Sequence, residues 1–165
     1  MYKHSSLFTK PRSLNQDDAI LMADIHRLCF PDAWTIELFY DCFTKPEWSG
    51  VFGFGIDYPL KLSDSSFEKS KHANLVGFIL GRTTYETNDI LTFAVNPAYQ
   101  KNGIGRILLA AYLEVAPPKC MLEVATGNAA AVHLYNTFGF KIIASRHDYY
   151  DNPDPAMRNA YVMGR

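Results

Sequence analysis

The stretch VNPAYQKNGIGR, residues 95–106, leads directly into ILLAAYLEV, residues 107–115, and places Gly103 and Gly105 where a helix is predicted to begin. The first backbone amides of a helix lack partners and carry a partial positive charge, so an anion can bind there. Glycine has no Cβ to hold a phosphate away from the backbone, and Arg106 adds a positive charge. The stretch therefore predicts a pyrophosphate-binding turn, although the two glycines alone fit a tight strand-to-helix connection equally well.

Two common phosphate-binding loops do not match this turn. A P-loop requires Gly-Lys followed by Ser or Thr, and this sequence has no such tripeptide. The dinucleotide fingerprint requires a third glycine, whereas the two glycines here are followed by Arg and Ile without it. The identity of the bound cofactor must therefore come from the rest of the chain.

Hydrophobic periodicity and turn residues divide the chain into strands and helices. Strands are predicted at 6–12, 51–56, 74–86, 88–96, 120–126, 141–150 and 156–165. Helices are predicted at 19–30, over a short segment after Thr35, at 103–115 and at 128–138. The order β-α-α-β-β-β-α-β-α-β-β predicts an α/β fold, with a single mixed central sheet of about six or seven strands flanked by about four helices. The sheet is expected to be antiparallel except where helix 103–115 connects two parallel strands.

Composition favours one folded domain and excludes several classes of function. The chain has 165 residues, 48% of them hydrophobic, so residues 1–165 are expected to form a single domain with residues 57–73 as a mobile loop. A net charge of −1 gives no overall attraction to nucleic acid or to a membrane, and neither is expected as a partner. The three cysteines have no CxxC spacing, which predicts free thiols and no metal site. Neither a membrane span nor a signal peptide is recognisable, so we expect a cytoplasmic protein, and we take it to be a monomer.

The stretch VNPAYQKNGIGR resembles the Q-x-x-G-x-G/A motif of the GNAT family of N-acetyltransferases, together with the V-x-P that precedes it. The predicted element order is also similar to the GNAT fold over nearly the whole chain. The resemblance implies acetyl-CoA as cofactor and CoA as product. It implies that the backbone of Phe93 and Val95 holds the pantetheine and the acetyl carbonyl, and that residues 101–106 wrap the diphosphate. The implied cofactor-binding residues are Phe93, Ala94, Val95, Gln100, Lys101, Asn102, Gly103, Ile104, Gly105, Arg106, Asn128 and Tyr135.

Three further segments are similar to one branch of that family, the ribosomal-protein alanine N-acetyltransferases of the RimI type. They are FPDAW (30–34), MLEVATGNAAAVHLYNTFGF (121–140) and RHDYY (146–150). The resemblance implies acetyl transfer to the α-amine of a protein, with the N-terminal alanine of a ribosomal protein as substrate. The implied substrate-binding residues are Phe30, Pro31, Trp34, Tyr149 and Tyr150. For the two tyrosines, a solvent-facing aromatic pair on a strand is the alternative.

Acetyl transfer to an amine requires a base, an oxyanion donor and an acid for the leaving thiolate. The resemblance makes Glu123 the general base, although an ordinary ion pair at the edge of a strand also explains a glutamate there. It makes Tyr135 the acid, because a phenol with a pKa of about 10 is protonated at neutral pH, although Tyr135 also fits core packing. We expect the oxyanion donor to be the amide of Val95, exposed where its strand splays at a bulge. Asn128 also fits a plain helix N-cap.

Alternative residues and alternative functions remain. His133 and His147 are other possible bases, but His133 is predicted to lie exposed on another face of its helix. The same fold also serves small-amine and lysine N-acetyltransferases, because function depends on the acceptor site. A non-catalytic sensor that binds acetyl-CoA is a third reading, and the presence of both Glu123 and Tyr135 argues against it.

Overall fold

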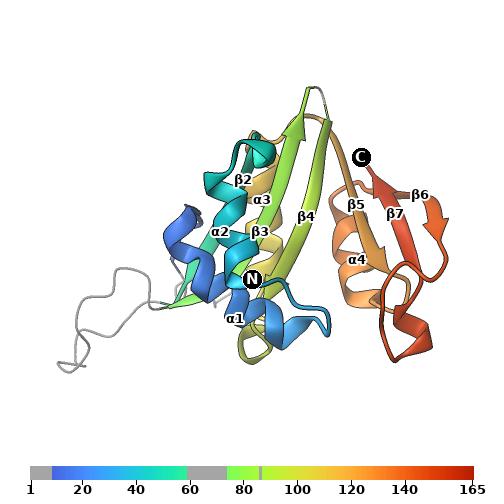
Figure 1. Ribbon diagram of the computed structural model, residues 1–165. Helices are drawn as coiled ribbons and strands as arrows, with labels where there is room; N and C mark the ends of the chain where they lie inside the picture. The colour runs from blue at the N-terminus through green and yellow to red at the C-terminus, as the bar shows by residue number, and fades with distance from the viewer. Residues whose placement is uncertain (1–8, 59–73, 86) are drawn as a thin grey trace.

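A seven-stranded mixed sheet lies between two layers of helices in the computed structural model, which describes residues 9–58, 74–85 and 87–165 (Figure 1). The strands are β1 (Arg12–Ser13), β2 (Val51–Asp57), β3 (Leu75–Thr84), β4 (Thr87–Val95), β5 (Lys119–Ala125), β6 (Lys141–Arg146) and β7 (Ala160–Gly164). The helices are α1 (Ala19–Cys29), α2 (Ile36–Thr44), α3 (Ile104–Val115) and α4 (Ala129–Thr137). The strand order in the sheet is β1-β2-β3-β4-β5-β7-β6. The α/β class and the predicted order of these elements along the chain are confirmed.

Three predicted strands are clearly shorter in the structure than the sequence indicated. The strand expected over 156–165 is limited to Ala160–Gly164, because Pro155–Met157 forms a short 3₁₀ helix before it. The strand expected over 6–12 is observed as the two residues of β1, and residues 1–8 lie outside the described residues. Strand β6 ends at Arg146 instead of residue 150, because Asp148 adopts a φ of +46°, which belongs to a turn. The loop predicted for 57–73 falls almost entirely outside the described residues, since Asp57 ends β2 and residues 59–73 are not described.

Strands β4 and β5 pair in parallel over four residue pairs, the last of which is Ile90 opposite Leu122. Past that point β5 continues beside β7, with Glu123 opposite Val162. The two strands lie together near the β3–β4 hairpin and diverge along their length (Figure 1). The last residues of β4 and of β5 therefore have no strand partner on the sides that face each other.

A buried polar cluster joins the two strands at their closed end. Asn88 of β4 is fully buried, and its Oδ1 accepts hydrogen bonds from the Tyr112 hydroxyl of α3 and, at 3.6 Å, from the Cys120 thiol of β5. Its Nδ2 donates to Thr83 Oγ1 at 3.0 Å. Gly81 makes room for this cluster, since a Cβ there would lie 1.7 Å from the Tyr112 hydroxyl oxygen. Because an unpaired buried amide is costly, these contacts favour one arrangement of the closed end.

The sheet separates two hydrophobic cores. Helices α1 and α2 cover one face, where Phe39 and Phe78 are fully buried. Helices α3 and α4 pack on the opposite face, where Leu108 is fully buried, and α3 is seen behind β2–β4 (Figure 1). Successive residues of β4 belong to opposite cores, because side chains alternate along a strand. Phe93 packs with α3 and α4, whereas Ala94 packs with α1 and α2.

The expectations drawn from composition concerned the state of the cysteines, metal sites and membrane spans. Cys29, Cys42 and Cys120 are free thiols. Within residues 9–58, 74–85 and 87–165, no three His, Cys, Asp or Glu side chains gather as a possible metal site. In the same part of the chain, every helix is too short or too polar to cross a lipid bilayer.

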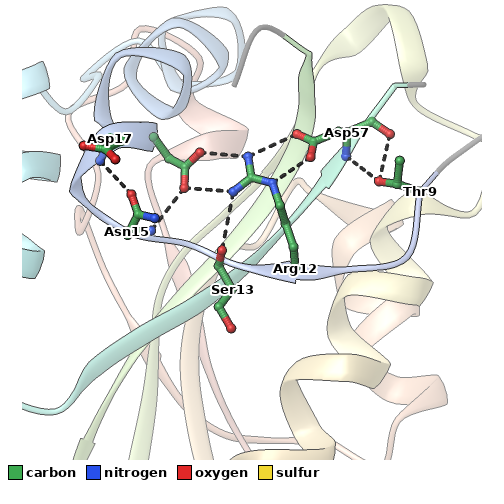
Figure 2. Close-up of polar contacts among 7 residues, drawn as sticks. Thr9, Arg12, Ser13, Asn15, Asp17 and Asp57 are labelled. Carbon is green, nitrogen blue, oxygen red and sulfur yellow. Dashed lines mark hydrogen bonds and ion pairs between the residues drawn. The ribbon is translucent and has the colours of Figure 1, made fainter. Parts of the chain in front are cut away.

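An arginine-centred ion cluster attaches β1 to the rest of the sheet (Figure 2). Arg12 donates from Nε and Nη2 to Asp57 of β2 at 2.6 and 3.1 Å. It also donates from Nη1 and Nη2 to Asp18 at 3.0 and 2.8 Å, and the Asp18 side chain is fully buried. Asp18 Oδ2 accepts from the Asn15 amide as part of a capping box ahead of α1. The hydrogen bonds to Asp18 and Asp57 raise the pKa of Arg12, so it stays charged.

We predict that Arg12→Met lowers the free energy of unfolding by about 2 kcal/mol or more, because it leaves the buried Asp18 carboxylate without its cation. Arg27→Met is the matched control, since Arg27 pairs with Asp24 at 2.9 Å on the exposed surface of α1. That control is expected to cost less than about 0.5 kcal/mol. Urea unfolding of both variants measures the difference, and equal losses would contradict the structural role of the cluster.

Candidate functional site

The turn after β4 holds its shape with its own polar side chains. Gln100 Nε2 donates to the Val95 carbonyl at 3.0 Å, and Asn102 Nδ2 donates to the carbonyls of Tyr99 and Gln100 at 3.1 Å. Lys101 has a φ of +62° and Gly103 a φ of +80°, so the residues on either side of Asn102 are both left-handed. Such conformations cost a non-glycine residue energy and tend to mark functional turns. The turn leads directly into α3, whose N-cap residue Gly103 has no side chain to accept from the first amides of the helix.

A groove of about 410 Å³ runs along this turn and across α4. We call it the turn groove. The predicted cofactor-binding residues line it, except Ala94 and Asn102. Ala94 is buried in the core on the opposite face, and the side chain of Asn102 is used within the turn itself. Ile104 is buried, with 1% of the residue exposed, and packs in the core beneath the groove.

A second cavity, of about 420 Å³, opens between the diverging strands. We call it the central cavity. Its walls come from β4, β5 and α4, from the loop after α1 and from the loop after β6. The predicted substrate residues Phe30, Pro31, Trp34, Tyr149 and Tyr150 all line it, as do Glu123 and Tyr135. The turn groove and the central cavity share Phe93, Asn128, Ala131 and Tyr135, so the two hollows meet at this point.

The amide of Val95 faces the side of β4 where β5 has diverged. Asn96 donates its amide to the Val76 carbonyl at 2.9 Å, and hydrogen bonding alternates along an antiparallel strand. Val95 therefore directs its own amide and carbonyl away from β3, and the carbonyl accepts from Cys29 Sγ at 3.4 Å. The bulge that we expected at Val95 is instead near Leu91, where the β3–β4 register shifts. The divergence of β4 and β5, and not a bulge at Val95, opens this edge.

Glu123 is the first residue of β5 beyond the parallel ladder. Its Oε1 lies 3.3 Å from Arg146 Nη2, so the ion pair considered from the sequence is present. The Glu123 side chain is 31% exposed and that of Arg146 54%, so the pair is wet and weak. Glu123 also lines the central cavity, so the ion pair does not exclude a role for its carboxylate there.

Tyr135 projects from α4 to the point where the two hollows meet. Its ring packs against Phe93 at 6.4 Å and Phe140 at 5.7 Å between ring centroids, so the core-packing reading is correct for the ring. Burial, followed by the nearby Tyr150 and Cys120, raises the pKa of Tyr135, so its hydroxyl stays protonated. The N-cap reading of Asn128 is also correct, since its Oδ1 accepts from the Ala131 amide at 3.1 Å.

Two loops that are distant in sequence close the outer side of the central cavity. In the loop after β6, the rings of Tyr149 and Tyr150 meet edge to face with centroids 4.9 Å apart, and the Arg146 guanidinium lies 5.3 Å from the Tyr149 ring. These tyrosines were expected on a strand, but they lie in the loop that follows β6. Tyr149 is 43% exposed, whereas burial raises the pKa of Tyr150 to about 12. His147 and His133 are both exposed.

The loop after α1, residues 30–34, is held by His26. The Trp34 amide donates to His26 Nδ1 at 3.1 Å, and the imidazole is 4% exposed. Burial lowers the pKa of His26 to about 4, while Asp32 acts weakly in the other direction. The unfolded chain binds this proton near pH 6.5, and the folded chain does not. His26 therefore makes the folded state less stable as the pH falls from about 6.5 to about 4.

The two hollows carry opposite charge. Lys101 and Arg106 line the turn groove. Asp32, Glu123 and Asp151 line the central cavity, and none of the described residues that line it is a lysine or an arginine. Arg146 pairs with Glu123, so the excess of acidic groups around the central cavity comes from Asp32 and Asp151. The turn groove therefore suits an anion, and the central cavity suits an amine better than an anion.

The comparison with known families decides the family of this chain. A family model described as the acetyltransferase (GNAT) family matches residues 20–140. The chain belongs to the GNAT family. The family and fold predicted from the turn motif and the element order are thereby confirmed.

Curated relatives of this GNAT match it over about half of its length. Ribosomal protein bS18-alanine N-acetyltransferase of Haemophilus ducreyi is 32% identical over 94 residues, 54% of this chain and 65% of that protein. N-alpha-acetyltransferase RimI of Mycobacterium tuberculosis is 43% identical over 96 residues, 55% of this chain and 59% of that protein. Both alignments span less than two thirds of the relatives. The crystal structure of the ribosomal-protein-S18-alanine N-acetyltransferase from Escherichia coli shares the fold, with a TM-score of 0.76, 22% identity, and coverage of 96% of this chain and 92% of that chain.

Sequence reasoning missed three residues of the candidate site. Arg146 begins the RHDYY segment but was assigned no partner from the sequence, and in the structure it pairs with Glu123. Cys29 lines the central cavity and donates to the Val95 carbonyl, a contact between segments 66 residues apart. His26 lies on the helical stripe of α1, where a histidine carries no signal of its own in the sequence. The one available clue was its position one helical turn before the FPDAW segment, from which a contact with that loop could have been inferred.

We predict that Gly105→Ala weakens CoA binding by about tenfold while leaving the protein as stable or more stable. An added Cβ would meet Leu134 and Phe93 at 3.4 and 3.5 Å, which is ordinary contact, but it would occupy the turn groove. Alanine is also favoured over glycine in a helix by about 1 kcal/mol. Calorimetric titration with CoA and thermal unfolding measure the two effects.

The matched control is Gly103→Ala. A Cβ at Gly103 meets nothing within 4 Å, but its φ of +80° is strained for alanine, so this variant should lose stability. Native CoA affinity in Gly105→Ala would show that the groove does not approach a ligand closely at this residue.

Proposed function

We propose that this GNAT is an acetyl-CoA-dependent N-terminal protein acetyltransferase. It transfers an acetyl group to the α-amine of a protein, and the N-terminal alanine of a ribosomal protein is the first candidate substrate. The observation that carries the proposal is the meeting of a basic groove and an acidic cavity at Tyr135, beside Glu123. One hollow suits the phosphates of the donor, and the other suits an amine.

The turn groove fits the donor. The amides at the start of α3 and the charges of Lys101 and Arg106 suit the diphosphate of acetyl-CoA. The unpaired edge of β4 suits the pantetheine, whose amides would bind the backbone of Phe93 and Val95 as a strand does. This arrangement would bring the thioester to the junction of the two hollows.

The reaction uses three groups of this chain. The acceptor amine attacks the thioester carbonyl carbon, and the Val95 amide donates to the oxyanion of the tetrahedral intermediate. Glu123 takes the proton that the amine releases, directly or through a water molecule. The C–S bond then breaks, and the protonated Tyr135 donates its hydroxyl proton to the departing CoA thiolate, leaving the acetylated amine.

A protein α-amine is the acceptor that the site supports best. At pH 7 about 10% of an α-amine with a pKa near 8 is neutral, against well under 0.1% of a lysine amine. A carboxylate that is partly exposed and ion-paired is a modest base, which is sufficient for the α-amine. The aromatic loops at 30–34 and 149–150 form walls suited to a peptide, and the names of the relatives agree with a protein N-terminus as substrate.

The remaining expectations stay predictions. They are a single domain over residues 1–165, a monomer, a cytoplasmic location, and no direct contact with nucleic acid or membrane.

The proposal is tested by mass spectrometry of a peptide incubated with the protein and acetyl-CoA. The peptide begins with Ala-Arg, has a free α-amine and contains one internal lysine, and a control peptide has its α-amine blocked. We expect one acetyl group on the α-amine and none on the blocked peptide. Acetylation of the lysine in both peptides would assign the protein to the lysine acetyltransferases. CoA binding without any transfer would favour a small-amine enzyme or a sensor.

We predict that Tyr135→Phe lowers kcat by about 100-fold, within the range of lost acid catalysis, while the Kd for acetyl-CoA changes less than about twofold. Tyr112→Phe is the matched control, because the Tyr112 hydroxyl donates to Asn88 in the core and lines neither hollow. That control should lose stability and keep kcat. Steady-state kinetics and thermal unfolding of both variants separate the two roles, and a native kcat in Tyr135→Phe would remove Tyr135 as the acid.

A further inference from the structure

The loop that forms the outer wall of the central cavity packs against the core through Trp34, whose ring lies 5.3 Å from Phe39 and 6.5 Å from Trp48 between centroids, and His26 supplies its side-chain hydrogen bond. Helix α1 ends at Cys29, and the amide of Phe30 donates to the His26 carbonyl at 2.9 Å. The amide of Trp34, at the other end of the loop, donates to His26 Nδ1 at 3.1 Å. The same residue therefore accepts a hydrogen bond from each end of the segment 30–34.

The His26 ring also packs against both aromatic residues of this loop. Its centroid lies 4.2 Å from that of Phe30 and 5.7 Å from that of Trp34, the latter in a stacked arrangement. On its other side the ring meets Phe39 of α2 at 5.5 Å. Phe30 and Trp34 both line the central cavity, so the position of the loop shapes the cavity wall.

We propose that His26 is a positioning residue, whose imidazole fixes residues 30–34 as the acceptor-side wall by accepting the Trp34 amide at Nδ1. The inference rests on the proposed function for the identity of the acceptor, a protein N-terminus. It assigns His26 no contact with the reacting atoms.

The hydrogen bond requires one protonation state of the ring. An amide only donates, so Nδ1 must carry a lone pair, and the proton of the neutral imidazole is on Nε2. Burial keeps the imidazole in this neutral form, with a pKa of about 4. Asp32 of the loop is the charged group that opposes this effect, and Phe39, its neighbour on α2, is uncharged. The loop is therefore held throughout the neutral pH range.

Packing alone would not require a histidine here. A phenylalanine would supply the same ring contacts with Phe30 and Phe39, but it has no acceptor for the Trp34 amide. The amide is partly buried by the fold, so losing its partner favours a displaced loop. Substitutions can therefore test the hydrogen bond to Nδ1 and the ring contacts separately.

The test uses His26→Phe, which keeps a ring, and His26→Asn, whose Oδ1 occupies the place of Nδ1 but lacks the ring. For His26→Phe we expect the KM for the acceptor peptide to rise about tenfold, the cost of one unmade hydrogen bond. The KM for acetyl-CoA and kcat should change less than about twofold. His26→Asn should lie closer to the native protein. A native peptide KM in His26→Phe, an equal rise for both substrates, or a worse defect in His26→Asn would overturn the proposal.

A spectroscopic measurement tests the loop without any acetyl transfer. The chain has two tryptophans, Trp34 and Trp48, so a Trp48→Phe background leaves Trp34 as the single reporter. We expect acrylamide to quench Trp34 more strongly in His26→Phe than in His26→Asn or in the native background. Equal quenching would overturn the proposal even where the native protein acetylates peptides. Conversely, absence of peptide acetylation by the native protein would count against the proposed function, while the quenching result would still decide the role of His26.

A third variant covers the case in which His26→Phe does not fold. In His26→Gln the amide oxygen is one bond further from the backbone than Nδ1. It should fail to accept from Trp34 and should behave as described for His26→Phe in both measurements. Circular dichroism establishes that each variant compared is folded.

Discussion

The short parallel ladder between β4 and β5 is the constraint on which the rest of the site depends. Four residue pairs hold the strands together, and beyond Ile90 and Leu122 each strand pairs on its outer side alone. The buried Asn88 cluster favours closure at one end, so the strands can part only at the other. The parting turns the backbone edge of β4 into a binding surface and opens a cavity through the middle of the sheet. Both hollows follow from this single departure from regular pairing.

Side chains of the site serve the fold and the proposed chemistry at the same time. The ring of Tyr135 is part of the core, and the residue also lines both hollows. Asn128 caps α4 and likewise lines both hollows, and Glu123 pairs with Arg146 while lining the central cavity. The structural and functional readings that the sequence left open are therefore not exclusive. A partly exposed pair restrains the carboxylate only weakly, which leaves it able to meet an incoming amine.

The helices and strands could be predicted from local sequence patterns. Features that depend on contacts between distant segments could not. The strands predicted at 51–56 and 74–86 from apolar, β-rich runs are observed as Val51–Asp57 and Leu75–Thr84, and the turn at Gly103 follows from glycine spacing. The end of β6 was misplaced because two tyrosines, which favour strands, follow shortly after Arg146, whereas a left-handed Asp148 ends the strand. The opening beside Val95 was attributed to a bulge because one sequence cannot show where a parallel partner stops pairing. Cys29 and His26 were missed for the same reason, since their importance lies in what they contact.

His26 shows how the acceptor side differs from the donor side in physical terms. The proposed donor side consists of backbone amides at the start of α3 and of a turn with left-handed residues. The proposed acceptor side is a loop held by aromatic packing and by one side-chain hydrogen bond to His26, and a neutral buried histidine makes the folded protein less stable below about pH 6.5. Packing alone does not require this loss of stability, because a phenylalanine would fill the same space. The proposed role of His26 therefore depends on the one atom that accepts the Trp34 amide, Nδ1.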